Sequence, residues 1–123
     1  MSVQIRVLEP ELDRLEGLWS DGLSDTYHAY LDQIDQPKLA LAAALIEVGL
    51  RLQGLGGRAA PATTLLMGDL CLARGSRLLA DHAPLAVQVA FARAIELLSS
   101  KAASEEPAPP ARQLLAASLG AAR

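Results

Sequence analysis

The sequence predicts an all-α fold, on three observations. Hydrophobic residues make up 51% of the 123 residues, and Leu and Ala supply most of them. Both are strong helix formers, whereas the aromatic residues that favour strands amount to only 3% of the chain. Prolines stand where new apolar helical patterns begin. We therefore expect a compact bundle of about five helices, followed by a marginal C-terminal helix.

The first two predicted helices are short. Pro10 suits the first position of a helix, because its missing N–H has no intrahelical partner there. Apolar residues follow Pro10 at spacings of three and four, up to a stop near Gly22. Ser24 and Asp25 can cap a second helix that reaches about Ile34.

The third and fourth predicted helices are apolar nearly all round. The third begins at Pro37 and reaches about Leu55, and the fourth begins at Pro61 and reaches about Asp81. A helix without a polar face is usually a buried helix. A domain of this size has little volume with which to surround two such helices. We therefore expect a second subunit to cover the excess apolar surface, in a homodimer or a heterodimer.

The last part of the chain changes in character. Pro84 starts a fifth helix, with one apolar stripe, that ends near Ser100. Residues 104–110 combine acidic residues with prolines and are expected to form an extended linker. Residues 111–123 regain a helical pattern but are too few for a stable isolated helix, so this tail should need a partner surface. The predicted organisation is one helical domain (1–103), the linker and the tail.

Charge and composition exclude several classes of function. The formal net charge is −3, and no basic stripe is present, so nucleic-acid binding is not expected. The uncharged runs are much shorter than the ~18 residues of a membrane span. The N-terminal residues lack the apolar run of a signal peptide, so we expect a cytoplasmic protein. His28 and His82 are isolated and Cys71 lies in an apolar helix, so we expect neither a metal site nor a cofactor.

Asp69 is the acidic residue most worth testing. It lies among leucines of the fourth predicted helix, so it is expected to be largely buried. A buried carboxylate needs a charged or hydrogen-bonding partner. Arg51 is the expected partner of Asp69, because the third and fourth helices are consecutive and should run antiparallel. We interpret the pair as structural. A small enzyme that uses Asp69 and an arginine is another hypothesis, but the sequence shows no evident acid–base pair to support it.

The stretch from Leu65 to Ala80 resembles a characteristic helix of the trans-prenyl diphosphate synthases. An apolar run leads into Gly68-Asp69, and large apolar residues, Ala, Arg and a Leu-Leu ending follow. The resemblance extends less specifically over about Leu39 to Ser100. It implies a truncated isoprenoid-synthase-like fold.

The departures from that family concern its catalytic motifs. The family holds Mg²⁺ between a diphosphate and two aspartate-rich motifs, but residues 53–57 stand where the first motif should be, and the second is absent. This profile resembles the non-catalytic small subunit of hexaprenyl and heptaprenyl diphosphate synthases. The resemblance implies a catalytic large subunit as partner. It places the partner interface on the fourth and fifth helices, at Leu66, Leu70, Arg74, Val87, Phe91 and Ile95. An unrelated helical module that homodimerises through the same surfaces is the alternative hypothesis.

Overall fold

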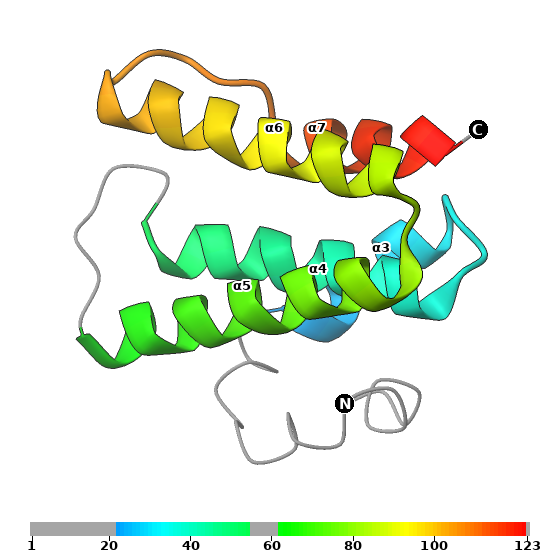
Figure 1. The fold of residues 1–123 in the computed structure, drawn as a ribbon. Coiled ribbons are helices and arrows are strands. Elements are labelled where there is room, and N and C mark those ends of the chain that lie inside the picture. Colours follow the sequence, from blue (N-terminus) through cyan, green and yellow to red (C-terminus); the bar gives the residue numbers. More distant parts are fainter. Residues whose placement is uncertain (1–21, 55–61, 123) are drawn as a thin grey trace.

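The computed structural model describes residues 22–54 and 62–122, and within them every regular element is a helix (Figure 1). This confirms the predicted fold class for the part of the chain described; the helix expected to begin at Pro10 lies outside it. In chain order the helices are α3 (Leu23–Leu31), α4 (Pro37–Leu52), α5 (Ala62–His82), α6 (Leu85–Ala103), α7 (Ala111–Leu119) and the 3-10 turn η2 (Gly120–Ala122).

Prolines mark the start of three of these helices. Pro37 is the first residue of α4, and Pro84 and Pro110 occupy the position just before α6 and α7. At the start of a helix the N–H that proline lacks would have no intrahelical partner. The start of α3 differs from the prediction: Gly22, with φ of 85°, stands at its N-cap, and Ser24 and Asp25 lie inside the helix.

Helix α4 forms the centre of the fold. Every residue from Leu39 to Leu50 is buried, and α4 lies against α3, α5 and α7. The prediction that the third helix is a buried one is therefore confirmed over this stretch. The same prediction is wrong for α5, whose buried residues all lie on one side while Leu66 is 67% exposed. The chain covers α4 by itself, so burial of this helix does not require a second subunit.

Glycines allow α4 and α5 to approach closely. A Cβ atom on Gly68 would lie 3.1 Å from the Gly49 carbonyl oxygen, and one on Gly75 would lie 2.9 Å from the Ala42 carbonyl oxygen. Residues earlier in α4 thus face residues later in α5, so the two helices are antiparallel, as predicted. Because glycine has no side chain, backbone packs directly on backbone at both crossings.

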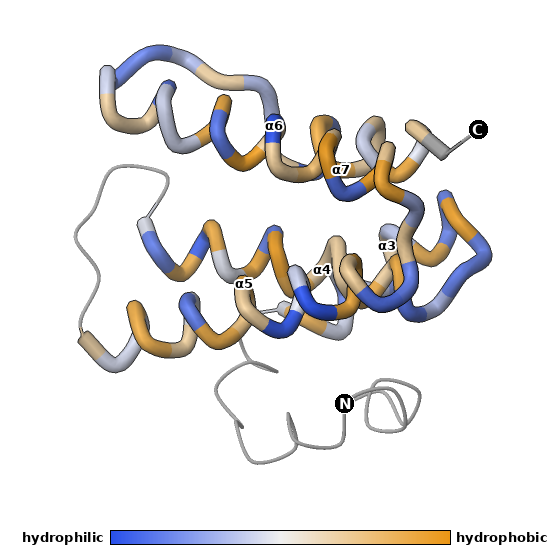
Figure 2. The backbone as a smooth tube through the Cα atoms, viewed as in Figure 1, coloured by the Kyte–Doolittle hydropathy of each residue, from blue (hydrophilic) through white to orange (hydrophobic). Residues whose placement is uncertain are grey.

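Helices α6 and α7 lie side by side, on one side of the α4–α5 pair (Figure 1). Leu115 and Leu119 of α7 are buried, as are Val87 and Phe91 of α6. The tail was expected to need a partner surface, and it finds one on α4 and α6 of its own chain. The exposed linker between α6 and α7 is hydrophilic where it leaves α6 (Figure 2).

Candidate functional site

The most unusual group in the fold is the carboxylate of Glu47. It lies in the middle of α4, among apolar residues, and the residue is only 6% exposed. Burial of an ionised carboxylate is costly unless the charge is paired and hydrogen-bonded. The side chains around Glu47 should therefore be the ones that compensate for this cost.

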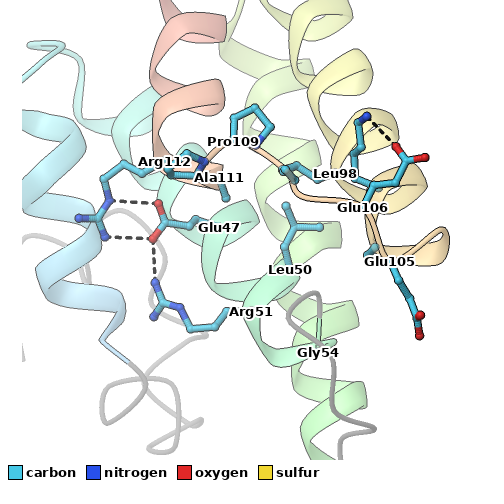
Figure 3. A pocket seen from close by; sticks show the side chains of 14 residues that line it. Glu47, Leu50, Arg51, Gly54, Leu98, Glu105, Glu106, Pro109, Ala111 and Arg112 are labelled. Atoms are coloured by element: carbon cyan, nitrogen blue, oxygen red, sulfur yellow. Dashed lines mark hydrogen bonds and ion pairs between the residues drawn. The ribbon is translucent and has the colours of Figure 1, made fainter.

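Three side chains hydrogen-bond to Glu47, and each of its two carboxylate oxygens accepts two hydrogen bonds. Figure 3 shows the bonds from Arg51 and Arg112. Oε1 accepts from the Tyr30 hydroxyl at 2.8 Å and from Arg112 Nε at 3.1 Å. Oε2 accepts from Arg51 Nη2 at 2.7 Å and from Arg112 Nη2 at 3.0 Å. Arg112 thus binds the carboxylate in the bidentate, fork-like geometry that is strong and directional for this pair.

Each donor comes from a different part of the chain. Tyr30 belongs to α3, Arg51 follows Glu47 by one helical turn in α4, and Arg112 lies in the first turn of α7. Pro110 is the last residue before α7, and Arg112 is the second residue of that helix. The cluster therefore joins α3, α4 and α7 through one buried charge.

The electrostatics of the cluster follow from this arrangement. Burial raises the pKa of Tyr30 well above its ordinary value, and the charge of Glu47 and its hydrogen bond raise it further. The hydrogen bond to Glu47 also raises the pKa of Arg112. Tyr30 therefore stays a neutral donor and Arg112 a charged one throughout the ordinary pH range.

A groove of about 770 Å³ opens beside the cluster, between α4, α6, the linker and the start of α7. Leu50, Leu98 and Pro109 contribute apolar lining, and Arg51 and Arg112 stand at one side (Figure 3). A salt bridge from Lys101 to Glu106, at 2.8 Å, closes another side.

The occupied lone pairs limit what Glu47 can do chemically. A carboxylate offers about four lone-pair positions for hydrogen bonding, and two donors meet each oxygen here. In this arrangement the carboxylate has no vacant position from which to take a substrate proton. The geometry is that of a structural connection between helices.

The predicted pair of Asp69 and Arg51 is wrong. Asp69 is exposed on α5, and its side chain accepts a hydrogen bond from Gln53 Nε2. Arg51 donates instead to Glu47. Asp69 is exposed because of the glycine packing. Gly68 faces α4, and in this orientation of α5 the next residue, Asp69, lies on the solvent side.

The residues predicted to contact a partner separate into two groups. Val87 and Phe91 are 0% and 1% exposed and belong to the core of the chain itself, which corrects their assignment to an interface. They are buried because they pack into the hydrophobic core cluster that also contains Leu115 and Leu119 of α7. The other predicted contact residues are at least partly exposed. Leu66 is exposed, and the three intermediate residues are Leu70, Arg74 and Ile95.

Within residues 22–54 and 62–122, no three His, Cys, Asp or Glu side chains are grouped so as to hold a metal ion. No helix in the same residues has both the length and the apolarity to cross a membrane. Comparison of the chain with protein-family models, curated proteins and solved structures finds no match. The resemblance to prenyl diphosphate synthases therefore rests on the sequence from Leu65 to Ala80 and its less specific extension over about Leu39 to Ser100.

Sequence reasoning missed Glu47, although a signal was present. Glu47 is the one charged residue between Lys38 and Arg51 in a helix that is otherwise apolar. The argument applied to Asp69, that a carboxylate among leucines needs a partner, applies more strongly there. The partner Arg112 could not be found from helical spacing, since it is 65 residues away.

Proposed function

We propose that this chain is a non-catalytic, partner-binding helical subunit. The partner that we propose is the catalytic large subunit of a two-component prenyl diphosphate synthase. In this role the chain supplies a binding surface that influences product length, and the large subunit supplies the metal-binding carboxylates.

The observation that carries the proposal is the outward face of α5. Helical geometry, at about 100° per residue, places one set of apolar side chains opposite the glycines that pack on α4. Leu66 is 67% exposed, and the set comprises Leu66, Leu70, Ala73 and Ala80; the Arg77 side chain, 77% exposed, lies on the same face. Because Gly68 and Gly75 fix the other side of α5 to α4, the helix cannot rotate to bury this face. An exposed row of this kind is typical of a protein–protein contact.

The class of partner follows from the resemblance. The outward face of α5 lies within Leu65–Ala80, the stretch that resembles the prenyl diphosphate synthases. The saturated Glu47 cluster supports a non-catalytic role, since its carboxylate serves to connect helices.

Binding to the catalytic large subunit from the same organism tests this proposal. Size-exclusion chromatography of the two chains, mixed at micromolar concentration, should show a heteromeric complex. Leu66→Glu should weaken that complex at least tenfold, because it places a charge at the most exposed leucine of the outward face of α5. Leu85→Glu is the matched control, since Leu85 is also an exposed leucine, at 73%, but lies on α6.

Three outcomes contradict the proposal. If the two chains elute as separate proteins, the large subunit is not the partner. If the complex tolerates Leu66→Glu, the outward face of α5 is not the binding surface. Self-association through the same face, without affinity for the large subunit, would favour the homodimeric module instead.

A further inference from the structure

Helix α6 ends in a motif that normally requires glycine. The backbone N–H of Glu106 donates to the Lys101 carbonyl at 2.9 Å, and the N–H of Glu105 donates to the Ala102 carbonyl at 3.2 Å. These two bonds define a Schellman motif, in which the residue at the position of Glu105 adopts a left-handed conformation. Glu105 has φ of 54° there, although a left-handed backbone is unfavourable for a residue with a Cβ atom.

The linker that follows connects α7 to the rest of the chain loosely. All residues from 104 to 110 are exposed, and three of them are prolines. The specific contacts of α7 are made to α4 and α6: Arg112 binds Glu47, and Ser118 Oγ lies 3.4 Å from the Ala90 carbonyl oxygen. We call this surface of α4 and α6, including Glu47 and Ala90, the α7 site.

We propose that the α7 site also accepts α7 from a second copy of the chain, so that two copies exchange their C-terminal helices. The occupant fits because it is the same helix, with Arg112 placed for Glu47 and two leucines placed for the core. A linker that crosses to a neighbouring copy need not turn back along its own α6. Glu105 is then released from the left-handed conformation, once in each copy.

The balance between the two forms depends on concentration. A short linker holds its own α7 at an effective concentration on the order of millimolar. Release of two strained residues per dimer lowers the concentration at which the exchanged dimer and the closed monomer are equally populated by about 1.5 to 3 orders of magnitude. Exchange should therefore be measurable at tens of micromolar, a range that self-association experiments reach.

Thiol cross-linking between two differently tagged chains tests the exchange. Both chains carry Cys71→Ala; one also carries Ala90→Cys and the other Ser118→Cys, at positions that are adjacent in the fold. After unfolding and refolding together, a short bis-maleimide should produce a covalent heterodimer. Chains that both carry Ala90→Cys are the control and should remain uncross-linked. Absence of the heterodimer at a few hundred micromolar, while a single chain with both cysteines cross-links internally, overturns the proposal.

A second measurement avoids cysteines in case those variants fail to fold. Sedimentation equilibrium of the unmodified chain should show a dimer, and Glu105→Gly should weaken it about tenfold or more, since glycine removes the strain from the closed form. A dimer held by the outward face of α5 would be insensitive to this substitution. An unchanged dimer constant, or a monomer at every concentration, contradicts helix exchange.

Discussion

The guanidinium of Arg112 binds the buried carboxylate of Glu47 with two nearly parallel hydrogen bonds, across 65 residues of sequence. This contact attaches the C-terminal helix to the central helix of the fold. It also completes the set of donors around a charge that would otherwise be costly to bury. The packing of α7 and the burial of Glu47 are therefore coupled.

Loss of Arg112 should destabilise the chain. Arg112→Ala removes the bidentate partner of Glu47 and leaves the hydrogen bonds from Tyr30 and Arg51. We expect the free energy of unfolding to fall by about 1–2 kcal/mol. The effect is limited because the Arg112 side chain is half-exposed. Lys101→Ala breaks the exposed pair with Glu106 and should cost about 0.5 kcal/mol or less. Urea unfolding compares the two variants. Equal effects would mean that Glu47 does not depend on Arg112.

The two buried tyrosines should respond oppositely to loss of the hydroxyl. Tyr30→Phe removes a donor from Glu47 and should cost about 1–3 kcal/mol. The Tyr27 hydroxyl is buried with no hydrogen-bond partner in the described part of the chain, so Tyr27→Phe should be neutral or stabilising by up to about 1 kcal/mol. Thermal unfolding of both variants, with the wild type, checks the difference. A destabilised Tyr27→Phe would point to a partner for that hydroxyl.

Alkaline pH should weaken the fold through Tyr30. Burial and the charge of Glu47 raise the pKa of Tyr30 above its unfolded value of about 10. Above that pH the unfolded chain releases the phenolic proton while the folded chain keeps it, so the stability contributed by neutral Tyr30 is complete below about pH 10 and declines as pH rises. Urea unfolding at pH 8 and pH 11 should show a smaller decline in Tyr30→Phe than in the wild type. An equal decline would assign the pH dependence to other groups.

The glycine crossing between α4 and α5 should not tolerate a side chain. A Cβ on Gly75 would lie 2.7 Å from Ile46 Cγ1 and 2.9 Å from the Ala42 carbonyl oxygen, and that backbone oxygen cannot move aside easily. Gly75→Ala should therefore cost about 1–3 kcal/mol. Gly120→Ala is the matched control, because no atom lies within 4 Å of the added Cβ, and it should be neutral within about 0.5 kcal/mol. Similar effects of both substitutions would contradict the close helix contact.

Local sequence patterns predicted much of the helical order. Proline positions and apolar periodicity placed α4, α5 and α6 within a few residues of their observed ends. Those signals succeed because a helix start and a helix face are local properties of the chain. The burial of α4 from Leu39 to Leu50 was also predictable, since a helix with no polar face has no side to present to water.

The orientation of α5 and the identity of the buried acid were not predictable in this way. The side of α5 that faces α4 is set by Gly68 and Gly75 fitting against Gly49 and Ala42, a match between two helices that composition does not reveal. Glu47 depends on Arg112 in the tail, which the linker at residues 104–110 separates in sequence from the main helical domain. Both features come from long-range contacts, which helical periodicity cannot show.

The condensation of isopentenyl diphosphate with an allylic diphosphate, in the presence of Mg²⁺, tests the central claim most directly. We expect the purified chain to form no product alone, and we expect its addition to the catalytic large subunit to change the rate or the chain length of the prenyl product. Leu66→Glu should abolish that change, and Leu85→Glu should preserve it. Turnover by the isolated chain, or a large subunit whose products are the same with and without it, would contradict the proposed role.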